Sequence, residues 1–304
     1  MKVLIVSRYK ENGFAPFVAE QAATLEGVGV ECRMFPVKSN NYLRYYPELK
    51  RAIRSFRPDI VHAHYGLCGL LANLQRRVPV VTTYHGSDIN DPKVRRLSKM
   101  AILLSAYNFF VSQKNIDLAR PKKNFTLIPC GINLADFPIV DKVDARKQIG
   151  LAQDGRYALF AGAFDNPIKN ASLAQAAVSQ LPGVQLLELK GYSRPQVALL
   201  MQAVDVMIMT SISEGSPQVI KEALACGCPI VSVDVGDVRE RVEGVEGCYV
   251  TKPHKLEELV SWLEKALSFG KRTNGRNAII RDGLTSEAVA SRLKKVYNQV
   301  SNTK

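Results

Sequence analysis

Residues 211–235 read SISEGSPQVIKEALACGCPIVSVDV, and their pattern is the strongest indication of the fold in this sequence. It follows the apolar run VDVMIMT at 204–210, which is typical of a buried parallel strand. Ser216 is the expected N-cap of a helix, and Pro217 suits its first position because a missing N–H costs nothing there. The helix is expected to stop at Gly227. A strand, a loop and a helix in this order predict one unit of an open α/β sheet.

Two acidic residues, Glu214 and Glu222, stand on either side of the expected helix start. Free N–H groups at a helix start, together with the helix dipole, favour a diphosphate in the crevice above the strand end. Glu222 could accept both hydroxyls of a ribose, and Glu214 could reach a sugar beyond the phosphates. Charged hydrogen bonds of this kind contribute roughly 1.5–3 kcal/mol each. The alternative is an ordinary solvated helix with a capped start.

The same alternation of strands and helices runs through the whole chain in two blocks. Strand-like runs of the first block lie at 3–7, 30–35, 59–64, 79–84, 108–112 and 125–130. The second block begins with strands at 157–162 and 184–189. This rhythm predicts an α/β protein with two Rossmann-like, doubly wound domains facing a cleft. We expect a first domain at 1–137, a linker at 138–153, a second domain at 154–283 and a final helix within 284–304 that begins at Ser286 as its cap.

Length and composition limit the class of protein. The 304 residues suit two domains, and no apolar stretch reaches the 18 residues of a membrane span. The apolar start at 3–6 is too short for a signal peptide. The six cysteines form no paired CxxC motif, which favours reduced thiols in a cytoplasmic enzyme. No HExxH motif and no two aspartates two positions apart occur, so we expect no metal-bridged diphosphate site.

Positive charge is concentrated in the first half of the chain. The net charge is +13, and residues 1–150 hold 23 Lys and Arg against 12 Asp and Glu. Such asymmetry predicts an anionic partner, which could be nucleic acid, anionic lipid headgroups or a phosphate-bearing acceptor. No helix-turn-helix, zinc or RNA-binding motif is present, so we expect no nucleic acid.

The segment 40–58 combines tyrosines with arginines and lysines. An inward apolar stripe leaves its cations outward, which fits a membrane–water interface or a phosphorylated acceptor, with a plain solvated face as the alternative. The tyrosines are Tyr42, Tyr45 and Tyr46, and the cations that extend the patch are Lys93, Arg95, Arg96 and Lys99.

Several motifs resemble one family. Glu214-Gly-Ser-Pro217 followed by Glu222-Ala is similar to the donor-site motif of retaining glycosyltransferases of family 4, which have the GT-B fold. Tyr84-His-Gly-Ser-Asp88 resembles a turn of that family's first domain, and Ile128-Pro-Cys-Gly-Ile-Asn133 resembles its interdomain crossing. Bacterial enzymes of teichuronic acid, capsule or O-antigen assembly look closest.

The resemblance implies roles for particular residues. His85 would hydrogen-bond a sugar hydroxyl and, with Glu214, act as a catalytic residue. The remaining donor-binding residues are expected to be Gly13, Lys169, Gly215, Ser216 and Glu222, with Gly13 allowing close backbone approach. Where the family has an arginine this chain has Ala163, so Lys169 would neutralise the diphosphate alone or with another cation. Arg239 is one candidate for that cation, and a surface salt bridge is its alternative role.

The implied activity is that of a retaining, metal-independent transferase without a cofactor. It would move a sugar from a UDP- or GDP-sugar to a lipid-linked or polysaccharide acceptor. We expect it to be cytoplasmic and peripheral at the inner membrane face, bound through the basic first domain. The final helix would cross back onto that domain. Alternatives are a nucleotide-sugar 2-epimerase of the same fold and a non-catalytic basic binding protein. His62 and His64 could suggest a metal pair, but no third ligand is evident, so a core or cleft-lining role is expected.

Overall fold

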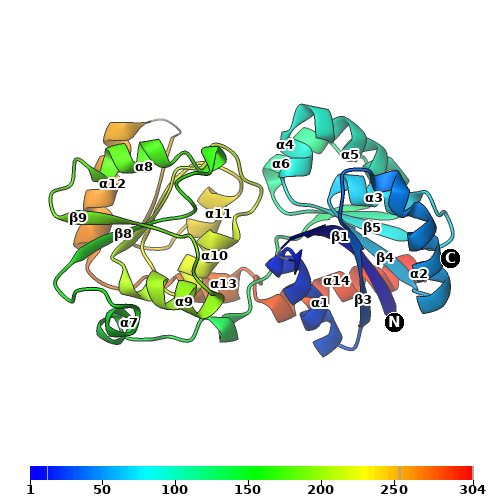
Figure 1. The fold of residues 1–304 in the computed structure, drawn as a ribbon, viewed down its shortest axis with the longest axis horizontal. Coiled ribbons are helices and arrows are strands. Elements are labelled where there is room, and N and C mark those ends of the chain that lie inside the picture. Colours follow the sequence, from blue (N-terminus) through cyan, green and yellow to red (C-terminus); the bar gives the residue numbers. More distant parts are fainter. Residues whose placement is uncertain (12, 253–254, 303–304) are drawn as a thin grey trace. The chain divides into compact units, whose positions relative to one another are not determined.

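The computed structural model describes residues 1–11, 13–252 and 255–302. The chain forms two compact units (Figure 1). The first unit comprises Met1–Gly131 together with Leu284–Lys304, and the second comprises Ile132–Gly283. Each unit has its own sheet with helices packed against it, so the predicted α/β fold with two Rossmann-like domains is confirmed.

The sheet of the first unit has the strand order β3-β1-β4-β5-β6-β7. These neighbours are all parallel, and the short strand β2 pairs antiparallel with β1. The order reverses between β1 and β4, and ligands of open α/β sheets bind at the carboxyl ends of the strands beside such a switch point. The strands are β1 (Lys2–Lys10), β2 (Gly13–Phe14), β3 (Glu31–Val37), β4 (Ile60–His64), β5 (Val80–Tyr84), β6 (Tyr107–Phe110) and β7 (Phe125–Leu127).

Helices cover both faces of this sheet. Successive residues of β1 point to opposite faces, so Ile5 lies in one core with α1 and α14, whereas Leu4 and Val6 lie in another with α2 and α3. Figure 1 shows α14 alongside α1. The helices are α1 (Pro16–Gly27), α2 (Tyr46–Phe56), α3 (Gly66–Asn73), α4 (Ser87–Asn90), α5 (Pro92–Leu104), α6 (Gln113–Ala119) and α14 (Ser286–Ser301), with a 3-10 turn at Tyr42–Tyr45.

The start of α14 differs from the expected one by one residue. The side chain of Thr285, not that of Ser286, accepts the capping hydrogen bond from the N–H of Ala288 at 3.2 Å. Ser286 is the first helical residue and is buried against Gly131, where a Cβ atom would lie 2.8 Å from its Cα. Thr285 has the extended backbone of an N-cap (φ −66°, ψ 151°), so it supplies the cap and Ser286 begins the helix.

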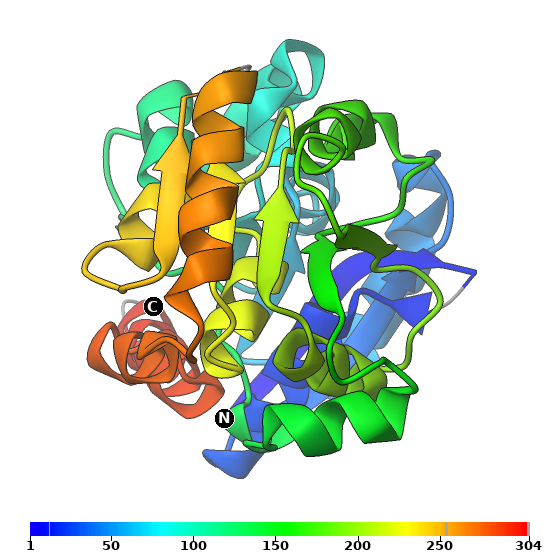
Figure 2. The ribbon, with the colours of Figure 1, turned by 90° about the vertical axis from the view of Figure 1, so that its left-hand side faces the viewer.

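The second unit has a sheet of five parallel strands in the order β9-β8-β10-β11-β12. Figure 2 shows α12, in orange, running alongside the yellow strands, against which it packs. The strands are β8 (Arg156–Phe160), β9 (Val184–Glu188), β10 (Val206–Met209), β11 (Ile230–Val233) and β12 (Cys248–Thr251). The helices are α7 (Lys142–Ile149), α8 (Ala171–Val178), α9 (Arg194–Ala203), α10 (Gln218–Ala225), α11 (Val238–Val242), α12 (Leu256–Phe269) and α13 (Gly275–Arg281), with 3-10 turns at Leu134–Asp136 and Pro167–Lys169.

Residues 138–153, expected to form a linker, belong to the second unit. They contain α7, which packs against α9. One of their polar residues, Arg146, is buried and pairs with Asp205 at 3.1 Å while donating to the carbonyl of Ala203 at 2.9 Å. A polar segment therefore serves here as part of a packed layer.

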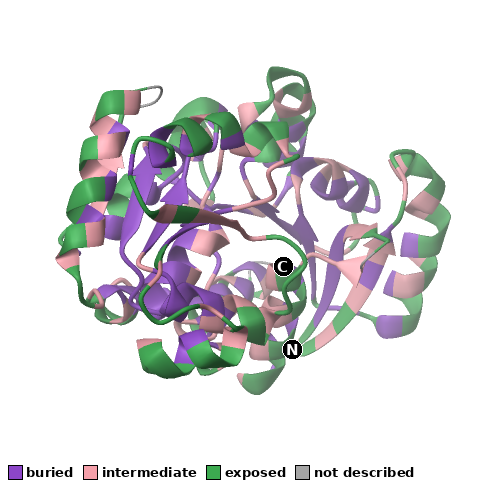
Figure 3. Cartoon of the chain, turned by 60° about the vertical axis from the view of Figure 1, so that its left-hand side comes forward, coloured by how far each residue is buried: buried purple, intermediate pink, exposed green. Residues whose placement is uncertain are grey.

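Burial follows the layers of each unit. Figure 3 shows buried strands flanked by helices whose outer faces are exposed. Every residue of β4, β5, β10 and β11 is buried, as expected of parallel strands with helices on both faces, although only β10 is apolar throughout. Among the described residues, no helix combines the length and the apolar character needed to cross a bilayer.

Candidate functional site

The switch point of the second unit lies between β8 and β10. The segment after β8 carries Lys169, and the loop after β10 carries Glu214, Gly215 and Ser216. Glu222 follows on α10. The expected donor-binding residues of this unit therefore lie at or just beyond the carboxyl ends of the two strands where a ligand is expected.

Lys169 and Glu214 form an ion pair across the switch point. The Lys169 Nζ lies 2.7 Å from Glu214 Oε1, and the two side chains are only 22% and 17% exposed. Thr210 holds the lysine's backbone, because its hydroxyl bonds the carbonyls of Lys169 and Asn170 at 3.0 and 2.8 Å. The lysine stem crosses Gly162, where a Cβ would lie 2.8 Å from its Cγ. The chain thus brings a cation and an acid together at one half-buried position.

The loop after β10 packs closely against the loop after β11. Gly236 has φ +56°, and a Cβ there would lie 2.4 Å from the carbonyl oxygen of Gly215. Within the described part of the chain, the backbone N–H groups of Gly215 and Ser216 donate to no backbone acceptor. These two N–H groups can therefore be offered to an anion.

The expected capping role of Ser216 is wrong. Its hydroxyl donates to Asp237 Oδ2 at 2.8 Å, and α10 begins two residues later without a side-chain cap. Asp237 is buried, and this burial raises the pKa of its carboxyl, against the opposing effects of Lys221, Arg241 and Ser216. A desolvated carboxylate needs donors more than the helix start does, and it draws the hydroxyl away from the helix.

Glu222 is held in a mostly buried position on α10. Its carboxylate lies 3.5 Å from Arg194 Nη1, and its side chain is 15% exposed. Burial raises the pKa of Glu222, and the charges of Arg194 and Lys221 oppose that rise. Arg194 also pairs with Asp136 at 3.3 Å and lies over the ring of Phe137.

Arg194 is a site residue that sequence reasoning missed. It is the first residue of α9, far from the motif that contains Glu222. A cation in the first turn of a helix opposes the helix dipole, so it needs an acidic partner or ligand nearby. That mismatch is the one signal in the sequence that could have found it.

In the first unit, Gly13 forms part of β2, paired with Lys10 of β1. Its φ is +98°, and a Cβ there would meet nothing within 4 Å. Glycine is therefore required by the backbone conformation and not by crowding.

His85 follows β5 and is enclosed by rings. Its Nε2 lies 2.9 Å from His64 Nδ1, and its Nδ1 lies 3.7 Å from Cys130 Sγ. The rings of Phe17 and Tyr65 each lie with their centroids 4.8 Å from that of His85. A ligand hydroxyl approaching this histidine would replace the weak thiol contact at Nδ1.

The turn that carries His85 is fixed by Asp88. The buried Asp88 carboxylate accepts hydrogen bonds from the N–H groups of Gly66, His85 and Gly86, each at 3.0 Å. Burial raises the pKa of Asp88 to about 6, with these backbone donors opposing the rise.

His62 and His64 are buried supports of this turn. His62 bonds Thr83 at 2.7 Å and the hydroxyl of Tyr297 at 2.6 Å, and its ring stacks on that of His64. Burial holds the pKa of His64 at about 3 and that of His62 well below its usual value. No three His, Cys, Asp or Glu side chains group as metal ligands in residues 1–11, 13–252 and 255–302.

Two buried polar atoms face the switch point of the first unit. Ser7 Oγ on β1 and His64 Nε2 on the adjacent strand β4 have no hydrogen-bond partner among the described residues. Buried polar groups are nearly always paired, so a ligand or water is expected there. Nothing in the sequence around Ser7 could have predicted this.

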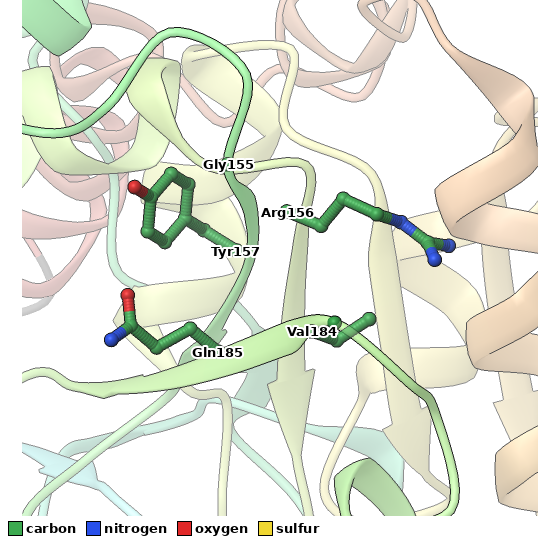
Figure 4. Close-up of a pocket in the computed structure, with 6 residues that line it drawn as sticks. Gly155, Arg156, Tyr157, Val184 and Gln185 are labelled. Carbon is green, nitrogen blue, oxygen red and sulfur yellow. The ribbon is translucent and has the colours of Figure 1, made fainter.

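Two other features lie outside the candidate site. Arg239 has an exposed side chain and pairs with Asp234 at 2.8 Å, so its alternative role, a surface salt bridge, is confirmed. The cavity in Figure 4, of about 340 Å³, is lined by the first residues of β8 and β9. These are the amino ends of the strands, opposite to the edge where Lys169 and Glu214 lie.

Family models match both units of the chain. The model described as Glycosyltransferase Family 4 matches residues 4–136, and the model described as Glycosyl transferases group 1 matches residues 147–268.

Curated relatives match at moderate identity. TuaC of Bacillus subtilis (strain 168), named for a glycosyltransferase role in teichuronic acid biosynthesis, is 28% identical over 215 residues, covering 61% of this chain and 55% of TuaC. D-inositol 3-phosphate glycosyltransferase of Mycobacterium marinum is 27% identical over 245 residues, covering 64% of this chain and 52% of that enzyme. This chain thus spans about half the length of the curated relatives that it matches.

Solved structures match in fold over the whole chain. Sucrose-phosphate synthase from Thermosynechococcus elongatus has a TM-score of 0.86 at 18% identity, covering 100% of both chains. Anabaena HepE in complex with UDP-glucose has a TM-score of 0.70 at 18% identity, covering 100% of this chain and 99% of HepE. UDP-GlcNAc 2-epimerase from Methanocaldococcus jannaschii has a TM-score of 0.63 at 12% identity, covering 98% and 100%.

Proposed function

Because this chain belongs to the family 4 glycosyltransferases with the GT-B fold, we propose that it transfers a sugar from a nucleoside-diphosphate donor with retention of configuration. The observation that carries the proposal is the Lys169–Glu214 pair beside the unoccupied N–H groups of the loop after β10. A cation, free amides and an acid at one switch point suit a diphosphate followed by a sugar.

The diphosphate would lie against Gly215 and Ser216. Lys169 would turn from Glu214 to the phosphates, and a sugar hydroxyl would then donate to the Glu214 carboxylate in place of the lysine. A lysine suits this exchange because its ammonium is a mobile point charge. Since the lysine and the amides supply positive charge, the proposal requires no metal and no cofactor besides the donor.

The ribose would lie over α10, with its hydroxyls donating to Glu222. The contact of 3.5 Å to Arg194 is long for a charge-assisted hydrogen bond, so a pair of ribose hydroxyls can compete with it. The base is proposed to be uracil or guanine, and the UDP-glucose bound by HepE supports the first.

His85 is proposed to stabilise the donor sugar from the first unit, through Nδ1. No protein nucleophile is assigned, because transfer is proposed to proceed by attack from the same face as the leaving diphosphate. The acceptor is proposed to be lipid-linked or a polysaccharide, reached at the cytoplasmic face of the membrane. The name of the relative TuaC supports a surface-polysaccharide acceptor.

The test is Glu222→Gln. We expect the KM for the donor to rise about ten- to a hundredfold, because two charged hydrogen bonds to the ribose are weakened. The unliganded protein should not lose stability, because the substitution removes a carboxyl whose pKa is raised by burial. Steady-state kinetics with UDP- and GDP-sugars and thermal unfolding measure the two quantities.

The matched control is Glu246→Gln, which makes the same chemical change at an exposed residue of the second unit. An unchanged donor KM in the Glu222 variant rejects the ribose role. The 2-epimerase of similar fold supplies the second candidate function. Release of an epimerised sugar from donor alone, without any acceptor, would favour that activity over transfer.

A further inference from the structure

The net charge of the protein resides entirely in the first unit. Residues 1–131 and 284–304 hold 24 Lys and Arg against 10 Asp and Glu, an excess of 14. Residues 132–283 hold 17 against 18, a deficit of one. The partner that this charge attracts must therefore meet the first unit.

Helix α5 exposes large apolar side chains within this basic unit. Its inner face buries Ser98, Ala101 and Ile102. Its outer face exposes Leu97 (44%), Met100 (50%), Leu103 (78%) and Leu104 (40%). Leu103 lies four and seven residues after Lys99 and Arg96, so it shares one side of the helix with both cations. A cationic face with protruding apolar side chains is the composition of an interfacial helix.

A basic pocket adjoins this face. It has a volume of about 400 Å³ and lies between α5 and the end of α6. Its one acid, Asp117, already accepts a hydrogen bond from Gln113 at 2.8 Å. Within the described part of the chain, none of its four cations forms a salt bridge. The lining residues are Pro92, Arg95, Arg96, Lys99, Asp117, Leu118 and Arg120.

Helix α2, which belongs to the other part of the predicted basic patch, lacks these features. Arg51 and Arg54 are exposed, but α2, which the structure describes in full, exposes no large apolar side chain. The three tyrosines of the segment 40–58 are half-buried and pack against the core beneath α2. The 3-10 turn before α2, likewise described in full, exposes a single large apolar side chain, Leu43 (68%), whereas α5 exposes four beside a basic pocket. Of the two parts of the predicted basic patch, α5 is therefore better suited to enter an interface.

We propose that the pocket between α5 and α6 binds the phosphate of an anionic lipid headgroup, while Leu103, Met100 and Leu97 enter the boundary between headgroups and acyl chains. Guanidinium groups suit a phosphate because they bind its oxygens in pairs. Apolar side chains beside them favour a bilayer over a soluble phosphate compound, since only a bilayer would bury them. The inference deepens the membrane location in the proposed function, but it concerns binding alone.

The test is sedimentation of the full chain with vesicles of phosphatidylcholine, with and without phosphatidylglycerol. The wild type should bind the anionic vesicles, and high salt should weaken this binding. Arg95→Glu/Arg96→Glu should weaken it about tenfold or more. Met100→Ser/Leu103→Ser should also weaken it, while leaving the salt dependence in place.

The matched control is Arg51→Glu/Arg54→Glu on α2, which changes the net charge by the same amount in the same unit. It should retain most of the binding. Equal loss in both double variants would overturn the assigned site, and so would a wild type that ignores phosphatidylglycerol. Displacement of the protein from vesicles by a short RNA at matched phosphate would assign the surface to nucleic acid instead.

Donor binding measured in the absence of vesicles tests the proposed function independently of the lipid site. The rise in Tm caused by a nucleotide sugar should be the same in all these variants and in the wild type. A protein that binds vesicles but never releases a nucleoside diphosphate would reject transfer and keep the lipid site. A protein that transfers sugar but does not bind anionic vesicles would reject the lipid site and keep the transfer activity.

Discussion

At the scale of single residues, the ring of His85 is set by a neighbour that no motif includes. His64 Nδ1 lies 2.9 Å from His85 Nε2, and burial keeps the pKa of His64 at about 3. At neutral pH, His64 therefore carries one ring proton, and its position decides which nitrogen of His85 is protonated. His64 is thus a positioning residue for the proposed contact between His85 Nδ1 and a sugar.

His64→Phe should lower kcat by about tenfold or more, because the ring of His85 loses the hydrogen bond that orients it. The donor KM should change little, because the diphosphate and ribose are held elsewhere. His64→Asn should recover much of the activity, because its amide can occupy the place of Nδ1. Equal kcat loss in both variants, or a rise in KM alone, would contradict the positioning role.

The sequence could identify His85, Lys169 and Glu214 because each lies in a short loop after an apolar strand. It could not identify their partners. His64 is 21 positions from His85, and Arg194 is 28 positions from Glu222. Which residues pair depends on which strands are adjacent and on the lengths of the loops. The local periodicity of the sequence does not predict the order of the strands.

At the scale of elements, a single carboxylate joins two turns. Asp88, after β5, accepts N–H groups from its own turn and from Gly66, the first residue of α3 after β4. Asp88 thereby fixes the loop that follows β4 relative to the loop that follows the neighbouring strand β5. The strands and long helices could be predicted from apolar runs, whereas α7, α11 and α13 were missed. These three are short and polar, and packing against neighbouring helices stabilises them.

Asp88→Asn should destabilise the protein by about 1–3 kcal/mol at about pH 4, because the new amide faces the N–H of Gly66. The pKa of Asp88 is about 6 in the folded protein, above the ordinary 3.8. The folded state therefore binds this proton more tightly, and the resulting stability is present below about pH 4 and is lost as the pH rises through about 6.

The difference in Tm between wild type and variant should accordingly narrow between those pH values. Thermal unfolding followed by circular dichroism across this range measures it. Asp91→Asn, at the exposed N-cap of α5, controls for the substitution itself. A difference in Tm that widens with rising pH would contradict the argument.

At the scale of the whole molecule, residues distant in sequence complete the first unit. Leu293 and Tyr297 of α14 lie in the same core as Val3 and Ile5 of β1. The hydroxyl of Tyr297 also bonds His62, which supports the turn of His85 through His64. The candidate site of the first unit therefore depends on a helix that follows the entire second unit in sequence.

Leu293→Ala should destabilise the first unit by about 2–5 kcal/mol, because it leaves a cavity in a well-packed core. Two units with separate cores need not unfold together, so the second should keep its own transition. Differential scanning calorimetry with limited proteolysis can distinguish the two. Lys295→Ala, exposed on the same helix, is the control, and an equal shift of both transitions would show that the units unfold as one.

The placement of α14 also has a consequence during translation. When residue 131 leaves the ribosome, the sheet face that α14 will cover is still bare, and the next 152 residues, 132–283, build a different unit. At bacterial and eukaryotic synthesis rates this interval lasts on the order of ten to thirty seconds. Through this interval Ile5 of β1 and Val18 of α1 lack the part of their core that α14 supplies. It is therefore the part of the polypeptide that should engage a chaperone first.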